Sequence, residues 1–147
     1  MKTSHGRTGG GIGAETPDAG INHRPNASIL KTFPNEHPHR DYEVHLHCPE
    51  FTSLCPMSGN PDFGVIDIIY TPKNLCIETK SLKQYILAFR SERIFNEHAV
   101  NLILNDILAA CSPVRAKVVG TFNVRGGISI TVTAQHPDPA KPQRGRC

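Results

Sequence analysis

The chain has 147 residues, which is enough for one domain with a hydrophobic core and too few for two ordinary domains. Its 16 Lys and Arg against 13 Asp and Glu give a net charge of +3, and the basic residues are scattered, so we expect no direct nucleic-acid partner. No apolar run reaches the about 18 to 20 residues of a membrane helix, and no hydrophobic signal core is present. We therefore expect a soluble cytoplasmic protein with no membrane partner.

The two ends of the sequence are poor in residues that can pack. Residues 1–38 are rich in glycine, proline and polar residues, and residues 136–147 contain three prolines. We expect a disordered arm over 1–38, a single folded domain over 39–135 and a flexible tail over 136–147. The glycines at positions 9–13 are not a dinucleotide fingerprint, because no strand pattern precedes them and no helix pattern follows.

The first half of the predicted domain reads as strands. Residues 41–48 alternate in places, and residues 65–70 form a β-branched run interrupted only by Asp67. A short run at 75–78 is expected to extend the same sheet after a turn at 72–74.

Two helices follow. Residues 81–90 place apolar side chains at helical spacing, with Ser81 as the expected N-cap. In the second helix the apolar residues are spaced i, i+3, i+4, i+7, i+8 and i+11 and stop before Pro113; they are Val100, Ile103, Leu104, Ile107, Leu108 and Cys111.

A β-hairpin over 114–134 ends the domain, because its apolar residues occupy even positions on both sides of a turn at Gly126 and Gly127. The order strand, strand, helix, helix, strand, strand predicts an α+β fold, an antiparallel sheet with both helices on one face. Such a sheet has two exposed edges, so we expect a homo-oligomer.

Three clusters contain residues of the types that catalyse reactions or bind ligands. The first is the Pro- and Gly-rich segment 48–64, read as a loop, which contains the thiol of Cys55 and the carboxylate of Asp62. A free thiol has a pKa of about 8.5, so a catalytic Cys55 needs a nearby group that stabilises the thiolate. The blander alternative makes Cys55 a packing residue and Asp62 a turn residue.

The second cluster, 78–85, joins a strand to a helix, where Lys80, Lys83 and free backbone N–H groups can converge on phosphate. Its alternative is a solvated helix start. The third cluster is Asn96-Glu97-His98, which can also be read as a helix cap with Asn96 as the N-cap.

The histidines at 45 and 47 share one face of a strand, whereas Cys48 points to the other face. Two histidines on a solvent-facing strand need no ligand, and the five cysteines contain no C-x-x-C pair, so we predict no metal site. Because the number of cysteines is odd and the expected compartment is reducing, a disulfide framework is not expected either.

The residues in these clusters and the order of the clusters along the chain resemble the short form of 7-cyano-7-deazaguanine reductase, the nitrile reductase of the queuosine pathway. The resemblance is carried by Phe51-Thr52-Ser53-Leu54-Cys55-Pro56, by Gly59-Asn60-Pro61-Asp62-Phe63 and by Glu78-Thr79-Lys80-Ser81-Leu82-Lys83. It implies the tunnelling fold shared with GTP cyclohydrolase I, in which small subunits close through their sheets into a ring and place the ligand sites between subunits.

The resemblance also implies roles for individual residues. Cys55 attacks the nitrile carbon to give a covalent thioimide, Asp62 supplies a proton, and two NADPH complete the reduction. The deazaguanine edge is bound by a set of polar groups on Ile77, Glu78, Thr79, Asn96 and Glu97, and the NADPH phosphates by Lys80, Ser81 and Lys83. The family commonly has His at the position of Asn96, and an amide does not transfer protons as an imidazole does.

Two further hypotheses stay open on the sequence. The same fold is compatible with a zinc-dependent cyclohydrolase acting on a purine nucleotide, with His45, His47, Cys48 and Cys111 as ligands. The chain is also compatible with a non-catalytic oligomeric binding module, in which Cys55 is buried and Glu97 only caps a helix.

Overall fold

The computed structural model describes residues 24–141. The chain begins with two short elements and a long hairpin, followed by a short strand, two helices joined by a 3-10 turn, and a second hairpin. The elements are η1 (Ala27–Ile29), β1 (Thr32–Pro34), β2 (Val44–Leu54), β3 (Pro61–Thr71), β4 (Leu75–Ile77), α1 (Thr79–Leu87), η2 (Ala88–Ser91), α2 (Asn96–Cys111), β5 (Arg115–Arg125) and β6 (Ile128–His136).

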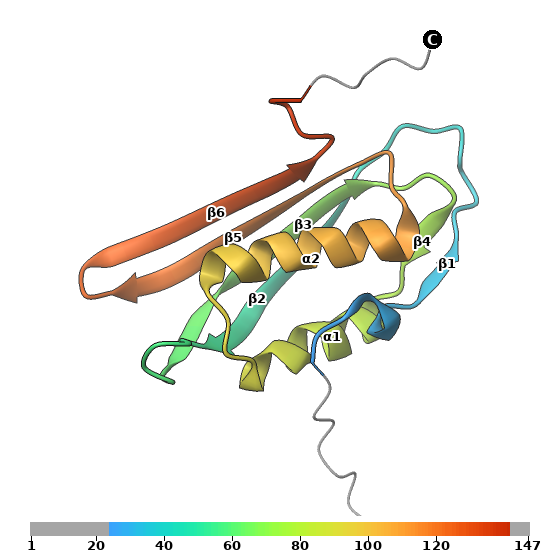
Figure 1. The fold of residues 1–147 in the computed structure, drawn as a ribbon. Helices are drawn as coiled ribbons and strands as arrows, with labels where there is room; N and C mark the ends of the chain where they lie inside the picture. The colour runs from blue at the N-terminus through green and yellow to red at the C-terminus, as the bar shows by residue number, and fades with distance from the viewer. Residues whose placement is uncertain (1–23, 142–147) are drawn as a thin grey trace, which may run out of the picture.

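The main sheet has four antiparallel strands in the order β2-β3-β5-β6. Helices α1 and α2 lie side by side on one face of this sheet, and no helix of residues 24–141 covers the other face (Figure 1). The predicted α+β class and the position of both helices on one face are confirmed. Strands β2 and β6 are the two edges of the sheet.

Strand alternation decides which side chains enter the core. The even-numbered residues of β3 and β5, except Val124 at the exposed end of β5, face the helices and are buried, whereas most odd-numbered residues face solvent. Gly120 shows how closely α2 packs on the sheet, since a Cβ added there would be 2.6 Å from Cγ2 of Val100. A glycine at 120 is therefore required by the close approach of helix and strand.

The two helices lie where they were predicted, but their N-cap residues differ from the predicted ones. The N-cap of α1 is Glu78 and not Ser81, because the Glu78 carboxylate accepts hydrogen bonds from two backbone N–H groups of the first turn. Asn96 is the first residue of α2, and the N-cap is Phe95, which makes no side-chain cap hydrogen bond. The predicted end of α2 is confirmed: Cys111 is its last residue, and Ser112 is a left-handed C-cap before Pro113.

The predicted C-terminal hairpin is also confirmed. Strands β5 and β6 pair antiparallel, and Gly126 and Gly127 form the turn with φ of 57° and 79°. Both residues adopt the left-handed conformation that a tight hairpin turn requires and that glycine reaches without strain.

A second sheet consists of β1 and β4 only. The segment at 75–78 therefore does not extend the main sheet as predicted, and residues 24–38, assigned to a disordered arm, contain η1 and β1. Sequence reading missed these elements because they are three residues long and depend on a distant partner strand. The remainder of the predicted arm, 1–23, and the end of the predicted tail, 142–147, lie outside the described residues.

The segment 48–64 is a hairpin and not the predicted loop, since only residues 55–60 lie between β2 and β3. Pro49 is accommodated because β2 is an edge strand with a register shift between Cys48 and Phe51.

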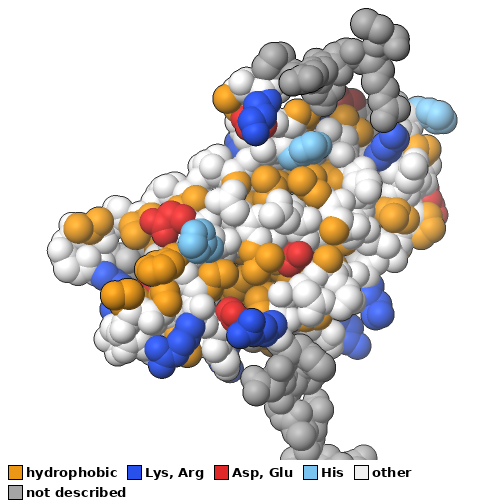
Figure 2. Space-filling model, viewed as in Figure 1, with side chains coloured by type: hydrophobic (Ala, Val, Ile, Leu, Met, Phe, Trp, Pro, Cys, Tyr) orange, Lys and Arg blue, Asp and Glu red, His pale blue; other side chains and the backbone are white. Residues whose placement is uncertain are grey.

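None of the helices within residues 24–141 is long and apolar enough to cross a membrane. Lys and Arg side chains are spread over the face seen in Figure 2 and do not form one stripe.

Candidate active site

Cys55 lies at the tip of the β2–β3 hairpin, in a turn closed by its own backbone. The Cys55 N–H donates to the carbonyl of Asn60 at 2.8 Å, and the Gly59 N–H donates to the carbonyl of Cys55 at 2.8 Å. Gly59 has a φ of +73°, a conformation that an L side chain rarely adopts. This turn brings the backbone and hydroxyl donors of Met57 and Ser58 round toward the Cys55 sulfur.

The pKa of the Cys55 thiol is lowered. The chief cause is hydrogen bonding from the Ser58 backbone, followed by its hydroxyl and by the Met57 backbone, while burial and the charge of Asp62 act in the opposite direction. Donors aimed at sulfur stabilise the thiolate, the reactive form of cysteine. The tip of the hairpin therefore provides the activating groups that the sequence required but did not identify.

Asp62 lies at the start of β3 and is 8% exposed. Its Oδ1 accepts a hydrogen bond from Nη1 of Arg125, which comes from the end of β5. The pKa of Arg125 is raised, mostly by its hydrogen bond to Asp62 and its attraction to that carboxylate, with a smaller contribution from Cys55. A cation, a carboxylate and a thiol thus meet at one end of the sheet.

Sequence reasoning missed Arg125. The residue is 63 positions from Asp62, and the only local signal was a cation directly before the Gly126-Gly127 turn. Pairing of β5 with β3 brings the two side chains together.

The beginning of α2 is tied to the same end of the molecule. The Leu54 N–H donates to the carbonyl of Glu92 at 2.9 Å, and the Ile94 N–H donates to the carbonyl of Leu54 at 3.1 Å. Asn96 and Glu97 follow within three residues and so start α2 close to the hairpin tip. Glu97 is exposed, and the Asn96 Oδ1 is buried without a hydrogen-bond partner among the described residues.

The second cluster of the sequence analysis, residues 78–85 and from here on called the Glu78 cluster, lies elsewhere. The Glu78 N–H donates to the carbonyl of Lys31 next to β1, and its carboxylate accepts from the N–H groups of Lys80 and Ser81 at 2.6 and 2.7 Å. The backbone hydrogen bonds, that of Ser81 first, lower the pKa of Glu78. Its carboxylate is therefore held in place by the helix it caps.

Ser81 does not fit the predicted phosphate contact. The residue is 3% exposed, and its hydroxyl donates to the carbonyl of Glu78 at 2.7 Å and accepts from the Lys31 N–H at 2.9 Å. Ile77 is also buried, and its N–H donates to the hydroxyl of Tyr70 at 2.9 Å. Ser81 and Ile77 hold the start of α1 against the core.

The length of α1 separates the two halves of the predicted site within one chain (Figure 1). Helix α1 begins beside β4, and its other end leads through η2 to the hairpin tip. Cys55, Asp62, Asn96 and Glu97 therefore lie at one end, and the Glu78 cluster lies at the other. One chain alone does not assemble them.

A cleft of about 860 Å³ runs along the edge strand β2. Residues of α1 and η2 line one side, among them Thr79, Lys83 and Arg90, and Phe63 and Asn123 belong to the part lined by the sheet. Thr79, Lys80 and Lys83 are exposed, and neither lysine makes an ion pair within residues 24–141. The two ammonium groups are available to an anion.

The zinc ligands considered for a cyclohydrolase are not brought together. His45 and His47 face solvent on the helix-free side of the sheet and bond to Asp67, whereas Cys48 is half-buried on the opposite face of β2. The Cys111 thiol is buried and donates to the carbonyl of Ile107 within α2. The four residues do not form a common site.

Comparison with known proteins agrees with the motifs. A family model described as QueF-like protein matches residues 61–141. The NADPH-dependent 7-cyano-7-deazaguanine reductase of Syntrophus aciditrophicus is 53% identical over 110 residues, covering 75% of this chain and 79% of that protein. The protein of the same name from Magnetococcus marinus is 48% identical over 112 residues, covering 76% and 88%.

The fold is shared with a solved structure as well. The crystal structure of the archaeosine synthase QueF-Like in the apo form superposes with a TM-score of 0.60 at 24% identity, covering 63% of this chain and 91% of the other. At this identity the similarity shows a common fold. With the relatives at about half identity over most of their length, it follows that the chain belongs to the QueF-like family, together with the NADPH-dependent 7-cyano-7-deazaguanine reductases.

Proposed function

We propose that this chain reduces the nitrile of 7-cyano-7-deazaguanine to an aminomethyl group, with NADPH as the reductant, in queuosine biosynthesis. The observation that carries the proposal is the juxtaposition at the hairpin tip: a thiol of lowered pKa next to a carboxylate that is paired with a guanidinium. The names of the relatives support the same substrate and cofactor.

The covalent step uses Cys55 and Asp62. The Cys55 sulfur attacks the nitrile carbon, so that a carbon–sulfur bond forms and one π bond of the triple bond is lost. The thiol proton passes to the Asp62 carboxylate and from there to the nitrile nitrogen, which gives a neutral thioimide. Arg125 holds Asp62 in place for both transfers.

NADPH supplies hydride twice when bound. The first reduction converts the thioimide carbon to a tetrahedral centre, which expels the Cys55 thiolate and leaves an imine; the second converts the imine to the primary amine. In the first reduction the expelled Cys55 thiolate takes up one proton and the count of protons on nitrogen is unchanged, whereas the second reduction adds one proton at nitrogen. Lys80 and Lys83 are proposed to hold the cofactor phosphates, because both ammonium groups are exposed and unpaired among the described residues.

Substrate binding is proposed for the start of α2 and the Glu78 cluster. The Glu97 carboxylate is exposed in the first turn of α2 and suits the amino and ring N–H donors of the base. Asn96 offers a buried amide oxygen that lacks a partner, which a ligand donor would satisfy. Glu78, Thr79 and the backbone of Ile77 are proposed to complete the base contacts.

We further propose that the site is completed between subunits of a tunnelling-fold ring. The separation of the Glu78 cluster from Cys55 along α1 supports this, because a neighbouring chain can bring the two halves together. The unpaired edges of β2 and β6 provide strands through which such a ring can close.

The first test is to mix the protein with 7-cyano-7-deazaguanine in the absence of NADPH and measure its intact mass. A mass increase of one substrate per chain, lost in Cys55→Ala and kept in the matched variant Cys48→Ala, is expected. Cys48 is a suitable control because it lies on the same hairpin with its pKa raised to about 11, chiefly by burial.

Addition of NADPH to the adduct should then release the bound substrate, return the protein to its unmodified mass and consume two NADPH per substrate. A folded Cys55→Ala variant that still oxidised NADPH in the presence of the nitrile would contradict the covalent mechanism.

A further inference from the structure

We propose that His45, His47 and Asp67 form a binding site for a transition-metal dication such as Zn²⁺, which clamps β2 to β3 on the helix-free face of the sheet. The site goes beyond the proposed reaction and uses none of its residues. Sequence analysis predicted no metal here, because two histidines on a solvent-facing strand need no ligand and Cys48 points to the other face. It did not consider Asp67, which is 20 positions from the nearer histidine.

Sheet register places the three side chains on one patch. His47 stands directly opposite Asp67 in the β2–β3 pairing, and His45 stands opposite Ile69, which makes it the diagonal neighbour of Asp67. All three are odd-numbered residues of their strands and so point to the same face. Neither direct nor diagonal pairing was visible before the register was known.

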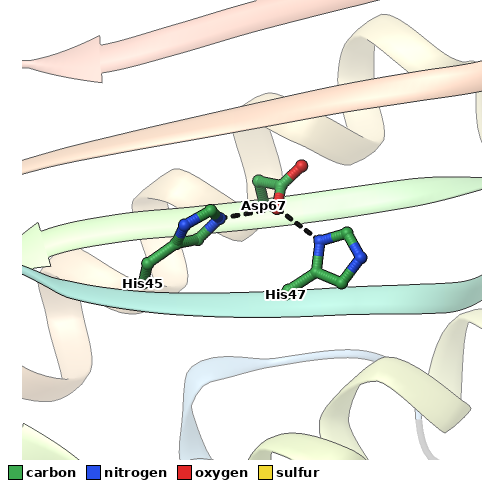
Figure 3. A network of polar contacts seen from close by, with 3 residues as sticks. All are labelled: His45, His47 and Asp67. Atoms are coloured by element: carbon green, nitrogen blue, oxygen red, sulfur yellow. Dashed lines mark hydrogen bonds and ion pairs between the residues drawn. The ribbon is translucent and has the colours of Figure 1, made fainter.

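The three ligand atoms converge. Asp67 Oδ1 lies 2.6 Å from Nε2 of His45 and 2.7 Å from Nδ1 of His47, and all three atoms lie within 4.8 Å of one another. Figure 3 shows the two imidazole rings on either side of the Asp67 carboxylate. Bonds of about 2.0 to 2.2 Å to zinc place tetrahedral ligands about 3.3 Å apart, so small side-chain movements suffice to admit an ion.

The chemistry of the ligands selects the class of ion. Two imidazole nitrogens and one carboxylate oxygen suit Zn²⁺, Ni²⁺ or Cu²⁺, whereas Mg²⁺ and Ca²⁺ prefer oxygen ligands alone. The side chains of His45 and His47 are 56% and 59% exposed, so solvent can supply a fourth ligand. Both rings also line the cleft along β2, which gives the ion an open approach.

The position of the site indicates what a bound ion would do. Strand β2 is an edge strand, so within residues 24–141 β3 is its only partner in the main sheet, and the pairing shifts register just after Cys48. A metal bridging His45 and His47 to Asp67 would fasten the two strands of the hairpin whose tip carries Cys55. We therefore expect metal binding to stabilise this hairpin.

The test is calorimetric titration of ZnCl₂ into the metal-stripped full chain, in a Cys55→Ala background that removes the reactive thiol as a competing ligand. Saturable binding of one Zn²⁺ that is lost in His45→Gln/His47→Gln and weakened at least tenfold in Asp67→Asn is expected. The matched control is His37→Gln/His39→Gln, another exposed i, i+2 pair that belongs to no such cluster within residues 24–141, and it should bind as the parent does.

A second readout is the melting temperature. Zn²⁺ at a hundredfold excess over its Kd should raise Tm by roughly 5 °C or more in the parent and in the control pair, and not in His45→Gln/His47→Gln. Tm values measured with EDTA present verify that all variants fold. Absence of saturable binding to the parent, or equal binding by His45→Gln/His47→Gln and the control pair, would overturn the site. Neither measurement requires the nitrile substrate, so the outcome is independent of the proposed reaction.

Discussion

Arg125 at the end of β5 donates a hydrogen bond to the buried carboxylate of Asp62 at the start of β3. This contact joins the C-terminal hairpin to the hairpin that carries Cys55. It makes the proposed proton carrier dependent on a residue outside the family motifs from which the site was predicted.

Replacement of Arg125 tests this dependence. In Arg125→Gln the Asp62 carboxylate loses the guanidinium that holds it, so the proposed proton acceptor for Cys55 is no longer fixed in place. We expect the rate of adduct formation with the nitrile to fall roughly tenfold to a hundredfold, within the range of general base catalysis. Arg125→Lys, which keeps the charge, should recover part of the rate, and equal rates in the two variants would contradict the role.

The hydroxyl of Ser58 is expected to tune the Cys55 thiol. Hydrogen bonding by Ser58 is the largest cause of the lowered pKa of Cys55, and part of it comes from the side chain. Ser58→Ala should therefore raise the pKa of Cys55, and the pH dependence of iodoacetamide alkylation should move to higher pH. Ser58→Thr retains a hydroxyl and serves as the control; superimposable profiles for Ser58→Ala and the parent would show that the hydroxyl contributes nothing.

Asn96 is expected to act on ligand binding and not on stability. Its Oδ1 is buried without a partner among the described residues, so Asn96→Ala removes an unsatisfied acceptor and should leave Tm unchanged or higher. Loss of a hydrogen bond to the substrate should raise KM about threefold to tenfold, corresponding to about 0.5 to 1.5 kcal/mol. Thermal unfolding and steady-state kinetics measure the two effects separately, and a lowered Tm with unchanged KM would assign Asn96 to folding.

The two helices are linked by a pH-sensitive contact. The Tyr85 hydroxyl donates to Asp106 Oδ2 at 2.6 Å, and burial raises the pKa of Asp106 while this hydrogen bond lowers it. Tyr85→Phe removes the donor and should cost about 1 to 2 kcal/mol of unfolding free energy at neutral pH.

The sign of the pH dependence follows from the protonation state. Without the donor, the pKa of Asp106 rises further, so the folded state favours the protonated acid and the penalty applies where Asp106 is charged. The difference in unfolding free energy between Tyr85→Phe and the parent should shrink as pH falls from 7 toward about 4. Urea unfolding at several pH values measures it, and a difference independent of pH would exclude Asp106 as its source.

The sequence by itself determined the elements whose signal is local. The apolar stripe of α2 repeats at helical spacing from Val100 to Cys111, and the β5–β6 hairpin combines period-two burial with a Gly-Gly turn, so both were predicted correctly. The motif residues Cys55 and Asp62 were also identifiable, because both lie within one short and distinctive sequence motif. Their proposed chemical roles stay predictions.

Only the tertiary structure decided which distant residues meet. The pairing of β1 with β4, the bond between Arg125 and Asp62, and the convergence of His45, His47 and Asp67 all depend on strand order and register. Register is fixed by the packing of one sheet face against α1 and α2, an energy summed over the whole core, and a shift of one residue would turn every side chain to the other face. Local sequence patterns do not reveal this total packing energy, so these contacts could be identified only from the folded structure.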